Sequence, residues 1–196
     1  VLVTKTIQTD TLIIGAGSSG CVLANRLSVE PDHRVTLIEA GGKDSWHWIH
    51  IPIGYLYTMG HPKTDWCYST TPQAGLNGRS LAYPRGRVLG GCSSINGMIY
   101  MRGQEADYDA WGSGWTWTDV LPYYKQSERY HRGADSYHSD QGELLVQEQR
   151  LKWDILETFK RVCEDSGFTD RPDFNCGDNS GVGYFEVNQK KGIRWS

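Results

Sequence analysis

Short apolar runs alternate with a helical stretch at the start of the chain. The run TLIIG, residues 11–15, is apolar until it stops at a glycine, which is typical of a parallel strand covered on both faces. The segment CVLANRLS at 21–28 favours a helix, and Pro31 ends the helical region. A second strand is expected for RVTLIEA, residues 34–40. The pattern therefore predicts a strand–turn–helix–strand unit and an α/β fold.

The rest of the chain contains patterns for a hairpin, three helices and two strands. The hairpin spans 65–84, and Leu76-Asn77-Gly78-Arg79 supplies its turn. The helix at 151–166 is amphipathic, and its apolar positions are expected to face inward. These positions are Ile155, Leu156, Phe159, Val162 and Cys163. The other helices are expected at 93–100 and 118–130, and the strands at 142–149 and 181–191.

Composition and charge narrow the function classes. The chain has 196 residues, of which 38% are hydrophobic and 22% charged, and its mean hydropathy is −0.53. These values describe a globular protein, and no apolar run approaches the roughly 20 residues of a membrane-spanning helix. A net charge of −3 gives no indication of nucleic-acid binding. Five cysteines without a C-x-x-C pair, and an N-terminus without a signal-peptide pattern, predict a reduced, cytoplasmic setting.

A glycine-rich loop joins the first predicted strand to its helix. Gly15 permits a tight turn, Gly17 lets a pyrophosphate approach the backbone, and Gly20 allows close helix–strand packing. The helix N-terminus that follows favours an anion. Glu39, about 20 residues after the loop, is placed to accept hydrogen bonds from both ribose hydroxyls and would repel a 2′-phosphate. The pattern predicts a dinucleotide site that disfavours NADP and leaves FAD and NAD open.

A second glycine cluster occurs in YPRGRVLGGCSSINGMIYMRG, residues 83–103. Its glycines keep side chains away from whatever lies beside them. Ser93, Ser94 and Asn96 are candidates to cap the helix expected at 93–100, which would provide another set of free N–H donors. Such donors suit a flavin's pyrophosphate or the polar edge of its ring. A purely structural glycine-rich loop is the alternative.

These segments together resemble the glucose–methanol–choline (GMC) family of flavin-dependent oxidoreductases. The resemblance rests on DTLIIGAGSSGCVLANRLS, VTLIEAGG, the stretch from 65 to 111 and GVGYFEVNQKKGIRWS. The stretch from 65 to 111 is similar to the first signature of the family. The matching positions are Gly86, Arg87, Leu89, Gly90, Gly91, Asn96, Tyr100, Gly103 and Asp109. One position departs, because Cys92 stands where the family has Ser, Thr or Gly.

The resemblance implies FAD as a non-covalent cofactor. Some members attach their flavin through a histidine in or near this loop, and the chain has no histidine between 62 and 130. The residues implied to bind the ADP half are Gly15, Gly17, Ser18, Ser19, Gly20, Glu39 and Ala40. Those implied to lie along the flavin are Arg87, Val88, Gly90, Gly91, Cys92, Asn96, Gly97, Met98 and Ile99. No metal site is expected.

The resemblance also implies a domain plan for the chain. Residues 1–140 would form the N-terminal part of a Rossmann-like FAD-binding domain, because the polar stretch 132–143 marks a candidate boundary. Residues 141–182 would begin an α+β substrate domain, and 183–196 would form a strand that returns toward the FAD domain. The family fold continues for hundreds of residues, so we expect this chain to be incomplete, and a second chain is one source of the remainder.

The activity implied is oxidation of a primary alcohol to an aldehyde, with hydride transfer to flavin N5. Choline-like, aliphatic and aromatic alcohols remain open, and so do a quinone-type acceptor and O2. The family's catalytic histidine is expected beyond Ser196, so no catalytic residue is assigned here. Three alternatives stay open: a lyase or photodecarboxylase of the same fold, a non-catalytic fragment or subunit, and an NAD-dependent dehydrogenase, which the second cluster disfavours.

The histidines are expected to be surface residues rather than catalysts. His47, His50 and His61 lie in a Trp-rich segment without metal-ligand spacing, and His131 and His138 lie in a polar stretch. The cysteines lack a local nucleophile signature and are expected to be structural. Trp66 and Tyr68, which alternate along the hairpin, are expected to be packing residues, and a tryptophan beside the flavin that borders the substrate pocket is the alternative for Trp66.

Overall fold

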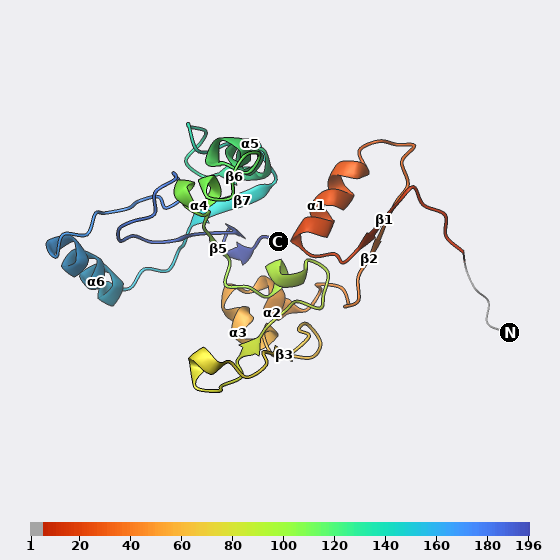
Figure 1. The fold of residues 1–196 in the computed structure, drawn as a ribbon, viewed down its shortest axis with the longest axis horizontal. Helices are drawn as coiled ribbons and strands as arrows, with labels where there is room; N and C mark the ends of the chain where they lie inside the picture. The colour runs from red at the N-terminus through yellow and green to blue at the C-terminus, as the bar shows by residue number, and fades with distance from the viewer. Residues whose placement is uncertain (1–5) are drawn as a thin grey trace. The chain divides into compact units, whose positions relative to one another are not determined.

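The computed structural model describes residues 6–196 and divides them into two compact units (Figure 1). The first unit comprises residues 6–97 with Ser196, and the second comprises 98–195. This division falls earlier than the expected boundary at 140, and the roles assigned to 1–140, 141–182 and 183–196 stay predictions. Residues 1–5, on which part of the signal-peptide prediction rests, lie outside the described residues.

The first unit begins with the predicted strand–helix–strand arrangement. β1 (Thr11–Ile14) pairs in parallel with β2 (Val35–Ile38), and α1 (Ser18–Leu27) connects them. The expectation that both faces of the sheet are covered is wrong for the described chain, because Ile13 is 8% exposed whereas Ile14 is 82% exposed. Successive strand residues point to opposite faces, so one face of this two-stranded sheet is buried and the other is open.

The remaining elements of the first unit are short. They are α2 (His47–His50), η1 (Pro52–Gly54), α3 (Tyr55–Thr58), β3 (Tyr68–Ser69), η2 (Ala74–Leu76), β4 (Ala82–Tyr83) and η3 (Gly91–Ser94). Their core is formed by Ile49, Val88 and Ile95, with Trp46 and Met59 packed against it. Val88 and Ile95 lie within the second glycine cluster, on either side of Gly90 and Gly91, so burial of these side chains fixes that loop in place.

The predicted hairpin is confirmed and is held by a buried carboxylate. β3 and β4 are antiparallel, and Asn77 and Gly78 adopt left-handed conformations at the turn, with φ of 53° and 73°. The Asp65 side chain accepts backbone hydrogen bonds from Gly60, Cys67 and Arg85 at 2.6, 2.9 and 2.9 Å. Burial raises the pKa of Asp65, but these three donors outweigh that effect and hold its pKa below the usual range.

The second unit is built around a four-stranded sheet of order β5–β8–β7–β6. β6 and β7 are parallel, and the other neighbours are antiparallel. Its strands and helices are β5 (Ile99–Tyr100), α4 (Glu105–Asp109), α5 (Trp117–Ser127), β6 (Glu128–Tyr130), β7 (Leu144–Glu148), α6 (Asp154–Asp165), β8 (Glu186–Val187), β9 (Gln189–Lys190) and β10 (Ile193–Arg194). The predicted strand at 142–149 corresponds to β7, and the one at 181–191 contains β8 and β9.

Two predicted helices differ from the structure. The helix expected at 93–100 is wrong: η3 ends at Ser94, Met98 has a left-handed φ of 64°, and Ile99 and Tyr100 form β5. A left-handed residue cannot continue a right-handed helix, and pairing with β8 favours the extended form. The helix expected at 118–130 runs instead from 117 to 127, because its last three residues become β6.

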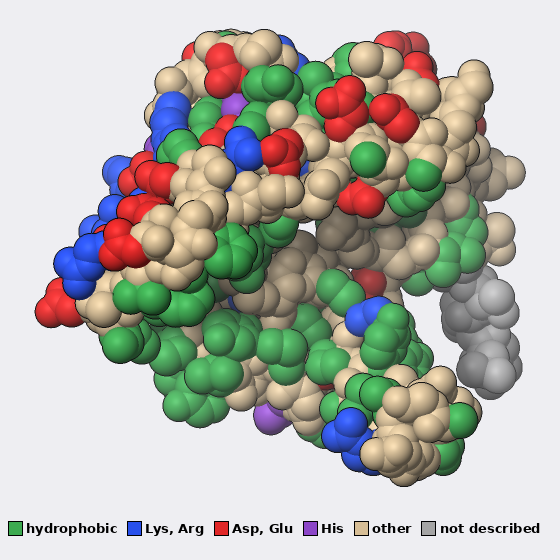
Figure 2. All heavy atoms as spheres, turned by 60° about the vertical axis from the view of Figure 1, so that its left-hand side comes forward, with side chains coloured by type: hydrophobic (Ala, Val, Ile, Leu, Met, Phe, Trp, Pro, Cys, Tyr) green, Lys and Arg blue, Asp and Glu red, His purple; other side chains and the backbone are tan. Residues whose placement is uncertain are grey.

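Helix α6 forms near its predicted position, but its apolar face is not buried. Ile155, Phe159 and Val162 are 68%, 62% and 54% exposed. The expectation that these positions face inward is therefore wrong for the described residues, which do not cover this face. Figure 2 shows hydrophobic side chains over large parts of the visible surface, in line with these exposures.

The second unit also has a buried charged centre that the sequence did not indicate. His138 is completely buried, so its assignment to the surface is wrong. Its Nδ1 lies 3.0 Å from Glu128 Oε1, its Nε2 lies 2.9 Å from Asp173 Oδ2, and its ring stacks on Tyr130. Burial lowers the pKa of the imidazole, but the bonds to both carboxylates outweigh burial and raise the pKa to about 9.

The first prediction concerns the pH dependence of stability. Because the folded pKa of His138 is about 9 against 6.5 unfolded, its contribution is complete below pH 6.5 and is lost as pH rises through 9. The contribution is on the order of 3 kcal/mol. Urea denaturation between pH 6 and 10 should show this decline in the wild type and a flatter profile in His138→Gln. The exposed His47→Gln is the control, and an unchanged slope in His138→Gln would contradict the assignment.

The second prediction concerns Asp65. Asp65→Ala leaves three backbone donors without their acceptor and should lower the free energy of unfolding by about 3 kcal/mol. Asp65→Asn retains one oxygen and should lower it less. Urea denaturation measures both variants, with the exposed Asp32→Ala as control. Equal stabilities for the Asp65→Ala and Asp32→Ala proteins would show that the carboxylate does not hold the hairpin.

Candidate dinucleotide-binding site

The first glycine loop forms the turn between β1 and α1. Gly15 has a left-handed φ of 98°, and its N–H donates to the carbonyl of Ile38 at 2.7 Å. A Cβ on Gly20 would lie 1.9 Å from the carbonyl oxygen of Gly15, so helix and turn approach too closely for a side chain there. A Cβ on Gly15 or Gly17 would meet no described atom within 4 Å. The loop is therefore tight on its helix side and open on the side of Gly15 and Gly17.

Glu39 ties this loop to the end of β2. Its Oε2 accepts the backbone N–H of Ala16 at 2.8 Å, and its Oε1 accepts that of Gly41 at the same distance. Each carboxylate oxygen has more than one lone pair, so both retain capacity for a ribose hydroxyl. The side chain is half-buried. Glu39 therefore organises the loop as well as offering acceptors, which the sequence pattern did not indicate.

The second glycine cluster lies directly against the first. A Cβ on Gly91, whose φ is 58°, would come within 2.8 Å of Gly17 Cα. The N–H of Gly90 donates to the carbonyl of Ala16 at 2.8 Å. A Cβ on Gly41 would lie 2.0 Å from the Arg87 carbonyl, so the strand end and the second cluster also touch through backbone. Two segments separated by about 70 residues in the sequence thus form one glycine-lined surface.

The serines of the second cluster brace their own loop. Ser93 Oγ donates to the carbonyl of Gly90 at 2.7 Å, and Ser94 Oγ donates to that of Leu89 at 2.8 Å. The expectation that they cap a helix at 93–100 is therefore wrong for these hydroxyls, because they satisfy carbonyls that precede η3. Cys92 is exposed, and its sulfur accepts the N–H of Gly86 at 3.4 Å. The loop geometry thus accommodates cysteine at the position that departs from the family signature.

Two aromatic residues of the hairpin border this region. The Trp66 and Tyr68 rings stack at 5.8 Å between centroids with an interplanar angle of 3°. The guanidinium of Arg87 lies 4.9 Å from the centre of the Trp66 ring. Arg87 is exposed, and its positive charge is available to an anionic ligand. Both side chains are nevertheless exposed, Trp66 at 41% and Tyr68 at 51%, so the expected packing role holds only for their contact with each other.

The predicted site residues fall mostly in the first unit. Residues 15–20, 39–40 and 87–97 all belong to it, whereas Met98 and Ile99 begin the second unit. Met98 is 4% exposed and its carbonyl accepts the N–H of Asn188, whereas Ile99 is 53% exposed. The residues that sequence analysis missed are Ala16 and Gly41, which bind Glu39. The only sequence signal for Ala16 is its position between Gly15 and Gly17, and the only one for Gly41 is its position two residues after Glu39.

This surface fits the diphosphate of a dinucleotide. The first residues of α1, Ser18 and Ser19, are exposed, and the free N–H groups of a helix N-terminus favour anions. No side chain narrows the space beside Gly15 and Gly17, and Glu39 stands at the adjoining strand end. Donors for a diphosphate and acceptors for a ribose are thus present in one connected structure.

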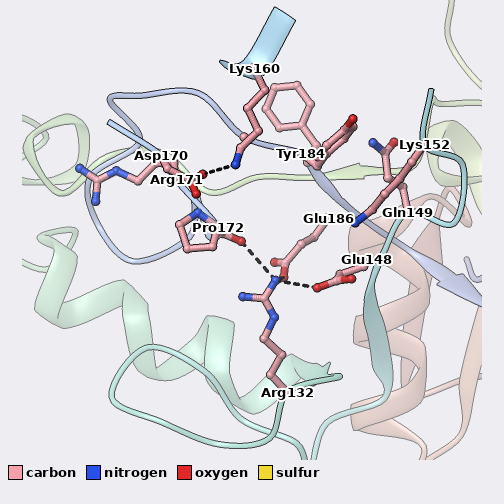
Figure 3. Close-up of a pocket in the computed structure, with 12 residues that line it drawn as sticks. Arg132, Glu148, Gln149, Lys152, Lys160, Asp170, Arg171, Pro172, Tyr184 and Glu186 are labelled. Atoms are coloured by element: carbon pink, nitrogen blue, oxygen red, sulfur yellow. Dashed lines mark hydrogen bonds and ion pairs between the residues drawn. The ribbon is translucent and has the colours of Figure 1, made fainter. Parts of the chain in front are cut away.

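A separate pocket of about 160 Å³ lies in the second unit (Figure 3). The Arg132 guanidinium lies between the Glu148 carboxylate and the Pro172 carbonyl, at 3.0 and 3.2 Å (Figure 3). Lys160 Nζ lies 2.9 Å from Asp170 Oδ1. The charged groups of this pocket are largely paired with one another, and none of them is a predicted site residue.

Residues 6–196 contain no group of three or more His, Cys, Asp or Glu side chains arranged to hold a metal ion. Within the same range, no helix has the length and apolar character needed to cross a membrane.

Comparison with known proteins places this geometry in a family. The chain is 43% identical over 192 residues to an alcohol dehydrogenase [acceptor] of Pseudomonas putida, covering 95% of this chain and 35% of that protein. It is 37% identical over 197 residues to the mitochondrial choline dehydrogenase of Mus musculus, covering 94% and 33%. The chain therefore spans about a third of the length of these relatives.

Solved structures agree with the sequence comparison. Pyridoxine 4-oxidase from Mesorbium loti superposes with a TM-score of 0.90 at 34% identity, covering 95% of this chain and 38% of that one. An FAD-dependent oxidoreductase from Chaetomium thermophilum gives a TM-score of 0.83 at 29% identity, covering 93% and 34%. The expected α/β fold and flavin cofactor thus agree with the structural neighbours. The GMC oxidoreductase family model matches residues 9–196, so the chain belongs to the GMC oxidoreductase family.

Proposed function

We propose that this chain is the N-terminal FAD-binding portion of an oxidoreductase that converts a primary alcohol to an aldehyde. The observation that carries the proposal is the approach of Gly91 to Gly17, which joins the two glycine clusters into one surface. A single glycine turn after a strand would suit many nucleotides. A second glycine-lined segment packed on that turn suits a longer ligand with a flat ring.

The residues of the first unit hold distinct parts of FAD in this proposal. The backbone of Gly15–Gly20 and the start of α1 bind the diphosphate, and Glu39 accepts the ribose hydroxyls of the ADP half. Arg87, the loop at 88–92 and residues 96–97 lie along the flavin, as do Met98 and Ile99, which begin the second unit. Bound FAD would supply an acceptor at N5 for the hydride that leaves the alcohol carbon. The chain's own residues bind and orient that group, and the burial of Val88 and Ile95 keeps their loop in place.

The substrate and the acceptor are proposed from the relatives. An alcohol dehydrogenase and choline dehydrogenases are among them, which supports a choline-like, aliphatic or aromatic primary alcohol. We propose a quinone-type acceptor or O2 as the electron acceptor. Because the relatives are about three times as long, we also propose that the catalytic base, a histidine, comes from polypeptide outside these 196 residues. That polypeptide is either a continuation of the chain or a second chain.

The third prediction concerns Gly17→Ala, a substitution that adds one methyl group to the proposed cofactor site. Gly17 has a φ of −79° and open space beside it, so Gly17→Ala should fold normally. Its methyl group would occupy the diphosphate position and should weaken FAD binding at least 100-fold. Quenching of flavin fluorescence measures the affinity, and thermal unfolding of the FAD-free protein checks the fold. The matched control is Gly75→Ala in the hairpin, which also has open space and should leave affinity unchanged.

Three outcomes would contradict the cofactor assignment. Equal FAD affinity for the Gly17→Ala and Gly75→Ala proteins would show that the diphosphate does not lie at this loop. Binding of NAD but not FAD by the wild type would instead favour the NAD-dependent alternative. A wild type that binds neither would show that the two clusters do not form a working site in this chain.

The fourth prediction concerns the reaction. A preparation that contains this chain with the rest of the fold should lose its flavin absorption when choline or another primary alcohol is added without oxygen. The isolated chain with FAD should keep its absorption, because it lacks the base. Flavin that stays oxidised with every alcohol in the complete protein would favour a lyase or decarboxylase.

A further inference from the structure

The side chain of Arg102 is a fully buried cation two residues after β5. Its Nη2 lies 2.7 Å from Glu128 Oε2, and both side chains have no exposed surface. Its Nη1 donates to the carbonyls of Tyr137 and Asn175 at 2.9 and 3.2 Å. The backbone N–H of Arg102 donates to Asn175 Oδ1 at 2.8 Å. Arg102 therefore fixes the chain just beyond β5 through its backbone and its side chain together.

The partners of Arg102 come from distant parts of the second unit. Glu128 begins β6 and also accepts from His138, whose other ring nitrogen faces Asp173. Asn175 reaches back to β5, where its Nδ2 donates to the Tyr100 carbonyl at 3.4 Å. Two cations and two carboxylates alternate in this chain of contacts, so their charges balance. Removing one member of such a buried set leaves an uncompensated charge.

The segment before Arg102 needs external support. β5 has only two residues, and within residues 6–196 its ladder contacts are with β8 alone. Met98, immediately before it, has a left-handed φ of 64°, which is unfavourable for a residue with a side chain. Such conformations persist where surrounding contacts over-determine them, and they occur at ligand clamps. Pairing with β8 supports Met98–Tyr100 laterally, and the anchored Arg102 holds the segment at its C-terminal end.

We propose that Arg102 is a positioning residue that holds Met98 and Ile99 in the conformation required along the flavin. It acts through β5, and it touches neither the cofactor nor the substrate. This inference rests on the proposed function, because Met98 and Ile99 are flavin-lining residues only in that proposal. The buried ion pair with Glu128 fixes the position of β5, and β5 in turn fixes the backbone conformation of Met98.

The fifth prediction tests this role by hydrogen exchange in the FAD-free chain. Arg102→Met should increase exchange at Met98 and at Tyr100 at least tenfold, with no change in residues 35–39 of the first unit. Arg102→Lys keeps the charge but loses the planar fork of donors, and should give a smaller increase at the same positions. The control is Lys160→Met, which removes ion pairs on the surface of the second unit and should leave exchange at 98–100 unchanged.

A second readout connects the positioning to the cofactor. Arg102→Lys should weaken FAD binding about tenfold and change the visible circular dichroism of the bound flavin, and Lys160→Met should change neither. Uniformly faster exchange across the second unit in both Arg102 variants, or loss of its fold in both, would overturn the proposal by showing a general structural role. Unchanged exchange at 98–100 would also overturn the proposal. So would an Arg102→Lys protein that binds FAD with the same affinity as a wild type that binds FAD. A wild type that does not bind FAD would refute the proposed function, and with it the flavin part of the inference, whatever the exchange shows.

Discussion

The close approach of Gly91 to Gly17 determines where the other residues proposed to bind the cofactor lie. A side chain at Gly91 would collide with Gly17 Cα at 2.8 Å, and the bond from Gly90 N–H to the Ala16 carbonyl fixes the same contact. Glu39 secures the other side of the loop by holding Ala16 and Gly41. Without this contact the chain would have a common nucleotide turn and an unrelated glycine loop. With it, both segments form one surface, which is the basis for proposing FAD.

The sequence predicted those parts of the fold that depend on local pattern. The strand–helix–strand start has its own glycine spacing and apolar runs, and the hairpin has its Asn77-Gly78 turn, so both were predicted correctly. The helix expected at 93–100 failed because Met98 and the pairing of β5 with β8 depend on residues about 90 positions later. His138 was misplaced for the same reason, since Asp173 lies far along the chain. The close contact of the glycine clusters was implied only by the family resemblance.

The interior of the second unit and the exposed face of its helix α6 differ in physical character. Its interior contains paired charges, and such pairs give less net stability than apolar packing because each charge must be taken out of water. Its helix α6 presents apolar side chains outward, as do β1 and β2 in the first unit. Residues 6–196 leave these apolar faces uncovered, and the relatives are about three times as long as this chain.

A nuclear magnetic resonance titration of the isotopically labelled chain with FAD and, separately, with ADP-ribose tests whether both glycine clusters bind the cofactor. ADP-ribose should shift the amide signals of Ala16, Gly17 and Gly41. FAD should shift these and also the amide signals of Gly90, Gly91 and Asn96. Shifts confined to the first loop with both ligands would contradict a flavin along the second cluster. Shifts in neither loop would contradict the site as a whole.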